Sequence, residues 1–229
     1  MNVLAALLVT ALFASLAYAL GMVSRGGALG GLVVGATIYY CLGPQGFAIL
    51  ALFVVGGSLL TRLGYGRKQR AGTAEAGGGR RGPRNALANA GVATLCALLA
   101  ALTYLDLFAA AFVASLSAAF ADTAESEVGQ LYPRAPRLIS SMRRVPSGTD
   151  GAVSPQGTLA GLAAAALTAA VGLALGLLEG PATALIVALA GFLGTVADSL
   201  VGALAPRLGN EITNVVCTLV AAVLALAFA

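Results

Sequence analysis

The sequence contains no histidine, and only 10% of its 229 residues are charged. Without histidine, Ser-His-Asp triads, histidine general bases and histidine metal sites are all excluded. Any chemistry must therefore use carboxylates, amides, hydroxyls and arginines. The scarcity of charge, with a hydrophobic content of 59% and a mean hydropathy of +0.93, places the chain outside the range of soluble domains.

Cysteine is also scarce. The three cysteines, Cys41, Cys96 and Cys217, stand singly inside apolar runs and form no Cys-x-x-Cys pair. Neither a disulfide framework nor a zinc site is indicated, so we expect small buried apolar residues at these positions.

Long apolar runs make up most of what is present. A bilayer is therefore the expected solvent, and helices are expected to cross it because the runs are continuous rather than alternating. The breaks between runs predict an all-α, polytopic transmembrane bundle of about eight helices. Their expected ranges are Val3–Leu20, Gly27–Leu42, Gly46–Leu63, Asn85–Leu102, Leu105–Ala121, Gly157–Leu178, Thr183–Leu204 and Ile212–Phe228.

We expect a single integral membrane domain over residues 1–229, with polar loops at 64–84 and 130–156. The first run ends in Ala17-Tyr18-Ala19, which resembles a signal cleavage site. The run lacks the positively charged segment that begins such signals, so we expect it to remain as a helix.

The basic residues are distributed unevenly between the connections. All 13 fall in alternate connections, at Arg25, between Arg62 and Arg84, between Arg134 and Arg144, and at Arg207. By the positive-inside rule, this parity predicts that the basic loops are cytoplasmic and that both termini lie outside. The net charge of +4 then indicates an anionic membrane face or a phosphate-bearing substrate as partner, rather than a nucleic acid.

Two stretches of sequence resemble each other. The segment 24–32 is similar to the segment 154–162, and paired asparagines open a later helix at Asn85 and Asn89 and again at Asn210 and Asn214. Because the offset is an even number of spans, a parallel internal repeat is predicted.

Acidic residues in or at the ends of membrane helices are expensive, so each is a functional hypothesis. Asp122 and Glu125 would share one helix face with Ser126 if the helix continues past Ala121. Asp198 lies near the end of a later run. These three carboxylates are candidate catalytic residues and Mg²⁺ ligands, because that ion prefers hard oxygen ligands. The alternatives are a solvated helix end and a structural hydrogen bond; the role of Glu127 is left open.

Two further features are suited to binding phosphate. The loop 143–154 combines Arg143 and Arg144 with a glycine-rich turn, and arginine forks and exposed backbone N–H groups both bind phosphates. Asparagines near helix starts, where anions are favoured, are the second feature. The candidate phosphate-binding residues are Arg81, Asn85, Arg143, Arg144, Gly148, Thr149, Asp150, Gly151 and Ser199, and Asn89 and Asn214 are candidate catalytic residues.

An ordered series of motifs resembles one known family of membrane proteins. The motifs are G-G-R-R at 78–81, L-A-N-x-G at 87–91, A-D-T-x-x-S-E-x-G at 121–129, P-R-L-I at 136–139, V-P-x-G-T-D-G-x-V-S at 145–154, G-F-x-G-x-x-x-D-S at 191–199 and N-x-x-x-N at 210–214. Together they resemble the family that includes the plant chloroplast phytyl-phosphate kinase. Ala152 and Asn85 depart from the family pattern, where glycine and glutamine are usual.

The resemblance implies a kinase that adds a second phosphate to an isoprenoid monophosphate. The implied donor is a nucleoside triphosphate, CTP by analogy with related polyprenol kinases, with Mg²⁺ as cofactor and membrane lipids as neighbours. A transporter or flippase for a lipid or small ion is the alternative, suggested by the repeat and the intramembrane acids.

Overall fold

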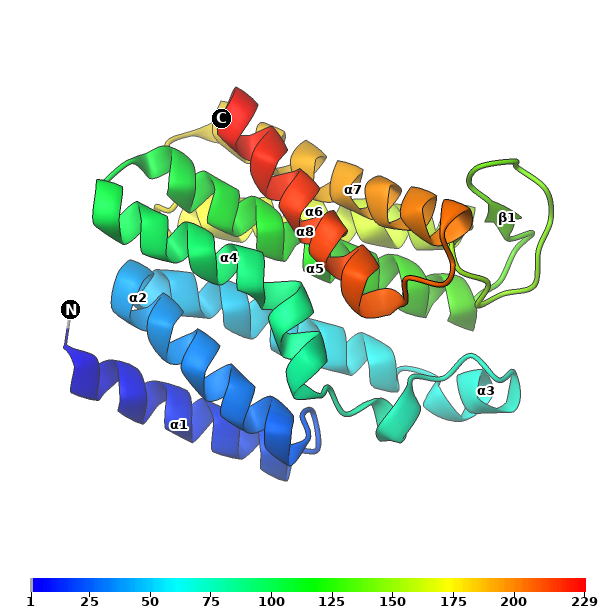
Figure 1. Cartoon of the computed structure of the whole chain (residues 1–229), viewed down its shortest axis with the longest axis horizontal. Coiled ribbons are helices and arrows are strands. Elements are labelled where there is room, and N and C mark those ends of the chain that lie inside the picture. The colour runs from blue at the N-terminus through cyan, green and yellow to red at the C-terminus, as the bar shows by residue number, and fades with distance from the viewer. Residues whose placement is uncertain (1) are drawn as a thin grey trace.

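The computed structural model describes residues 2–229, and these form a bundle of helices (Figure 1). The helices are α1 (Val3–Ala19), α2 (Arg25–Arg62), α3 (Tyr65–Arg70), α4 (Pro83–Thr103), α5 (Asp106–Leu131), α6 (Pro155–Ala174), α7 (Pro181–Leu204) and α8 (Asn210–Phe228). By length and composition, α2 and α4 to α8 are all able to cross a membrane. The predicted polytopic all-α bundle is therefore confirmed.

The helix α2 is two helices that fold back on each other at Gly43. Gly43 has φ 72° and ψ −167°, a conformation that a residue with a side chain rarely adopts, and Pro44 follows it. A Cβ added to Gly35 would lie 3.7 Å from Leu50, although a straight helix would separate these residues by about 22 Å. The two spans predicted on either side of Gly43-Pro44 are therefore both present (Figure 1).

The helix α5 lies at the centre of the bundle, and every residue from Ala109 to Ala121 is buried. It contacts α2, α4, α6, α7 and α8. Lipid offers little hydrophobic drive for association, so close packing of small residues must hold membrane helices together. Gly157 and Gly161 of α6 provide this closeness, since a Cβ at Gly157 would lie 2.6 Å from the Glu125 carbonyl oxygen.

Two predicted helix ends were wrong. The helix α5 continues ten residues past Ala121 to Leu131, and the next proline is Pro133. The helix α6 ends at Ala174 rather than Leu178. Gly176 has φ 73° there, and the Gly176 and Leu177 N–H groups donate back to the carbonyls of Leu173 and Gly172, which closes the helix.

The polar segments between helices have structure of their own at one end of the bundle. The first holds α3 and a 3-10 turn, η1 (Ala76–Gly79); the second holds two short antiparallel strands, β1 (Arg137–Leu138) and β2 (Ala152–Val153). Figure 1 shows α3 and β1 at the opposite end of the molecule from both chain termini.

The predicted repeat has a local counterpart in the structure. Ser24 and Ser154 each cap the helix that follows, accepting hydrogen bonds from the N–H groups of Gly27 (3.1 Å) and Gly157 (3.2 Å). In each case the capped glycine also approaches a carbonyl oxygen from elsewhere in the chain, that of Arg81 or of Glu125. The similar segments therefore make similar contacts.

Candidate active site

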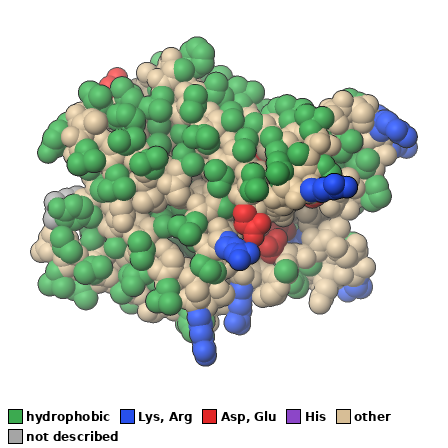
Figure 2. Space-filling model, in the orientation of Figure 1, with side chains coloured by type: hydrophobic (Ala, Val, Ile, Leu, Met, Phe, Trp, Pro, Cys, Tyr) green, Lys and Arg blue, Asp and Glu red, His purple; other side chains and the backbone are tan. Residues whose placement is uncertain are grey.

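A polar cavity of about 890 Å³ opens at the end of the bundle that carries the polar segments. Figure 2 shows acidic side chains gathered in a hollow near the middle of the visible face, with basic side chains beside it. The sequence-predicted residues that line the cavity are Arg81, Asn85, Asn89, Asp122, Glu125, Gly148, Thr149, Asp150, Gly151, Asp198, Ser199 and Asn214. Residues from five separated segments of the chain therefore face one space.

Arg143 and Arg144 do not line this cavity. Both are exposed in the segment between β1 and β2. The Arg143 carbonyl accepts a hydrogen bond from the Leu138 N–H (2.9 Å), and Arg144 pairs with Arg137 through the main chain. The turn between the strands thus holds these two arginines on the surface, apart from the other candidates.

The acidic residues come from two helices. Asp122 and Glu125 lie one turn apart on α5, on the face that lines the cavity, and Asp198 comes from α7. All three carboxylates line the same cavity, so α5 and α7 bring them to one space. The Thr158 hydroxyl donates to Glu125 Oε1 (3.2 Å), which orients that carboxylate.

The carboxylates suit a magnesium ion that is shared with a phosphate. Among residues 2–229, no three acidic or cysteine side chains form a metal-binding group by themselves. However, Asp198 Oδ1 is buried without a hydrogen-bond partner in the described part of the chain. Magnesium is usually held by one or two carboxylates together with water and substrate phosphates. The donor set fits an ion of this kind.

Arg81 is the cation most firmly placed at the cavity. Its Nη2 donates to the Thr123 hydroxyl (3.1 Å), its Nη1 donates to Asn85 Oδ1 (3.4 Å), and its guanidinium lies 4.9 Å from the centre of the Phe53 ring. Burial lowers the pKa of Arg81, and the nearby charge of Glu75 opposes that shift. An arginine starts from so high a pKa that it keeps its charge.

The segment around Arg81 is also held through its backbone. The Arg81 N–H donates to the Met22 carbonyl (3.1 Å), and the Arg81 carbonyl accepts from the Ser24 N–H (3.0 Å). A Cβ at Gly27 would lie 2.2 Å from that carbonyl oxygen, so only glycine allows this approach. The start of α2 therefore fixes the position of Arg81.

The asparagines form part of the cavity wall. Asn89 is only 3% exposed, and its Nδ2 donates to the backbone carbonyl (3.0 Å) and the Oδ1 (3.3 Å) of Asn85. Asn214 lines the cavity from the second turn of α8. These side chains place amide groups beside the carboxylates.

The glycine-rich turn docks against two other parts of the chain. Gly148 has φ 84°, and a Cβ there would lie 2.8 Å from Thr73. Gly151 has φ 73°, and a Cβ there would lie 2.5 Å from both the Ser199 carbonyl oxygen and the Ala203 nitrogen. The turn is therefore held between the segment after α3 and the end of α7.

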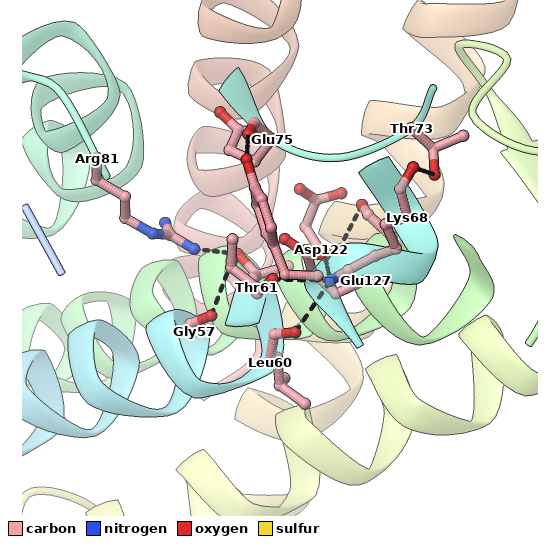
Figure 3. A network of polar contacts seen from close by, with 12 residues as sticks. Gly57, Leu60, Thr61, Lys68, Thr73, Glu75, Arg81, Asp122 and Glu127 are labelled. Carbon is pink, nitrogen blue, oxygen red and sulfur yellow. Dashed lines mark hydrogen bonds and ion pairs between the residues drawn. The ribbon is translucent and has the colours of Figure 1, made fainter. Parts of the chain in front are cut away.

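Sequence reasoning missed the part played by Lys68. This lysine is 1% exposed, and its Nζ is paired with Glu127 and donates to the carbonyls of Leu60 (3.2 Å) and Thr61 (2.9 Å), as Figure 3 shows. It thereby joins α3 to α5 and to the last turn of α2. Its position one turn after a helix end, where lysine commonly caps carbonyls, was the available signal.

Comparison with known proteins gives the family. The family model described as integral membrane protein DUF92 matches residues 8–222. The chain belongs to the DUF92 family. The resemblance deduced from the ordered motifs is thereby confirmed. No solved structure matches the chain.

Three relatives illustrate how the DUF92 family is spread. The uncharacterized membrane protein sll0875 of Synechocystis is 41% identical over 143 residues, covering 61% of this chain and 55% of its own. The chloroplastic protein VTE6 of Arabidopsis thaliana is 33% identical over 163 residues, covering 69% of this chain and 49% of its own. The uncharacterized membrane protein MJ0933 of Methanocaldococcus jannaschii is 34% identical over 149 residues, covering 65% of this chain and 61% of its own. The matches thus span about half to three fifths of these relatives.

Proposed function

We propose that this DUF92 protein is an isoprenoid monophosphate kinase that uses a nucleoside triphosphate, CTP by the family resemblance, as donor. The γ-phosphorus of the donor would gain a bond to an oxygen of the acceptor phosphate and lose its bond to the β-phosphate oxygen, giving a prenyl diphosphate and a nucleoside diphosphate. The observation that carries the proposal is the convergence of Asp122, Asp198 and Arg81 on one cavity. Similarity to a chloroplast relative supports it.

The chain's own residues would supply positioning and charge. Phosphoryl transfer needs these more than it needs covalent catalysis, so a protein without histidine is suited to it. Arg81 would bind anionic phosphate oxygens, and Asn85, Asn89 and Asn214 would orient the acceptor phosphate. The turn from Gly148 to Gly151 would present backbone N–H groups to the nucleotide. No general base is needed, because the acceptor oxygen is already anionic.

In this proposal Asp122, Glu125 and Asp198 would hold magnesium at the cavity. Bound there, the ion would neutralise charge on the phosphates. Without the ion, the three negatively charged carboxylates would repel the acceptor phosphate. The acidic residues are therefore compatible with phosphate chemistry only when a cation is bound beside them.

Depth in the bundle favours a kinase over a transporter. Transport sites lie near the middle of the membrane. Asp198 lies six residues, or about 9 Å, from the end of α7, and Asp122 lies nine residues, or about 14 Å, from the end of α5. Both distances are measured toward the polar segments. An off-centre site suits a soluble nucleotide that enters from one side.

The excess of basic residues around the cavity suggests which side that is. All 13 lysines and arginines lie in the connections at 21–25, 62–84, 134–144 and 205–209. By the positive-inside rule, this end of the bundle would face the cytoplasm, where nucleoside triphosphates are available.

The direct test is a transfer assay on the purified protein. Prenyl alcohols and prenyl monophosphates would be offered in turn with each nucleoside triphosphate and Mg²⁺, and lipid products separated and counted. We expect the monophosphate with CTP to turn over. If no pair of substrates turns over while proteoliposomes carry a lipid or an ion across the membrane, the transporter alternative replaces the kinase.

A further inference from the structure

A second, apolar groove of about 60 Å³ meets the polar cavity. Helix α1, both halves of α2 and the start of α4 form its walls. Its lining is almost entirely small or aromatic apolar side chains, among them Phe13, Ala28, Val34 and Phe47. It runs along α2 from Gly27 to Val34, which is about 10 Å of helix.

The groove and the polar cavity share two residues. Arg81 and Asn85 line both spaces. The guanidinium of Arg81 lies 4.9 Å from the Phe53 ring, and Phe53 is itself a wall of the groove. A phosphate held by Arg81 would therefore have a dry, apolar path beginning beside it, and an apolar path that ends at an anion-binding group suits an amphipathic phosphate.

We infer that this groove holds the isoprenoid chain of the acceptor, with its phosphate at Arg81 and Asn85. This inference rests on the proposed function and adds the place of the chain. The groove is narrow, so one wall must move to admit a chain, and α1 is the wall that gives way, because α1 packs substantially only against α2. A helix with one packing partner moves more readily than one enclosed by several.

Gly31 offers a way to block the groove. It lines the groove, and a Cβ added there would meet nothing within 4 Å, so a larger side chain would begin in open space at the groove wall. Gly91 of α4 is a matched control, because it is also a helical glycine with nothing within 4 Å of an added Cβ, and it does not line the groove.

The first experiment compares chain lengths in the transfer assay. For Gly31→Leu we expect KM for a long-chain prenyl monophosphate to rise about tenfold or more, while KM for a five-carbon prenyl monophosphate stays within about twofold. Gly91→Leu should leave both unchanged. Equal KM values for wild type and Gly31→Leu with the long chain would overturn the inference.

The second experiment does not depend on turnover. A prenyl monophosphate with a photoreactive diazirine near the end of its chain is irradiated with the intact protein, and the labelled peptides are mapped. We expect label in residues 10–17 and 27–34, lost in Gly31→Leu and kept in Gly91→Leu. Label spread over α6 and α7, or equal labelling of the groove by a diazirine phospholipid, would overturn the inference. Label in the groove without any phosphoryl transfer would support the groove as the binding site for the chain and would argue against the kinase function.

Discussion

Lys68 is paired with Glu127 inside the protein, and this contact joins the short helix α3 to the central helix α5. Two carbonyls at the end of α2 accept further hydrogen bonds from the same Nζ. Glu127 lines the polar cavity within two residues of Glu125. The pair therefore fixes one wall of the candidate site.

Breaking this pair should destabilise the protein. Removing one member of a buried pair leaves an uncompensated charge, which costs about 3–5 kcal/mol. We expect Lys68→Met and Glu127→Leu each to lower the midpoint of thermal unfolding in detergent. The double variant should be more stable than either single variant, because it leaves no buried charge. If the double variant lost as much stability as the two single variants added together, the charge pair would not be the cause of the destabilisation.

Gly151→Ala should disturb the glycine-rich turn. The added Cβ would lie 2.5 Å from two backbone atoms of α7, at a residue with φ 73°. Because displacement of a binding group by about 1 Å can cost about a hundredfold in rate, we expect transfer to fall by at least tenfold. Gly176→Ala is the control, since Gly176 has the same φ of 73° but nothing within 4 Å. Equal effects of the two changes on transfer would assign the loss to backbone strain alone.

Arg81→Lys tests recognition of phosphate by a fork of two N–H donors. A lysine keeps the charge but cannot bond Thr123 and Asn85 in the present geometry. Losing a hydrogen bond to a charged group costs about 1.5–3 kcal/mol, so we expect KM for the lipid phosphate to rise at least about tenfold. Arg80→Lys, at an exposed neighbouring position, should leave KM unchanged. Unaltered kinetics in Arg81→Lys would remove Arg81 from the phosphate site.

The proposed orientation in the membrane predicts which loops can be labelled from outside. Ser140→Cys and Glu179→Cys would be made in a protein whose three cysteines are replaced by alanine, and intact cells treated with an impermeant maleimide. Glu179, between α6 and α7, should react at once; Ser140, between β1 and β2, should react only after permeabilisation. The reverse pattern would place the candidate site outside the cell.

Much of this architecture could be predicted from the sequence because a bilayer imposes simple rules. The break at Gly43-Pro44 and the occurrence of basic residues in alternate connections can both be read directly from the sequence. The end of α5 was not visible in this way. Polar residues such as Asp122 and Glu125 suggest a helix end, yet their helix continues because the polar cavity solvates them where lipid would not.

The candidate site was predictable where polar residues interrupt apolar helices, as at Asp198 and Asn89. It was less predictable in the loops, where the sequence gives little information about which way a side chain points. Arg143 and Lys68 both lie in basic polar segments, but a strand turn holds the first on the surface and a helix-end contact buries the second. Such differences depend on tertiary contacts between distant segments.

The central claim is that Asp122 and Asp198, from two different helices, act together on a phosphate. The most direct measurement is the rate of phosphoryl transfer to a prenyl monophosphate by Asp122→Asn and by Asp198→Asn, with thermal unfolding measured alongside. Asp106→Asn, at the exposed opposite end of α5, is the control. We predict that each of the first two variants loses at least about a hundredfold in rate while remaining folded, and that the control keeps its rate. A wild-type rate in either Asp122→Asn or Asp198→Asn would contradict the account.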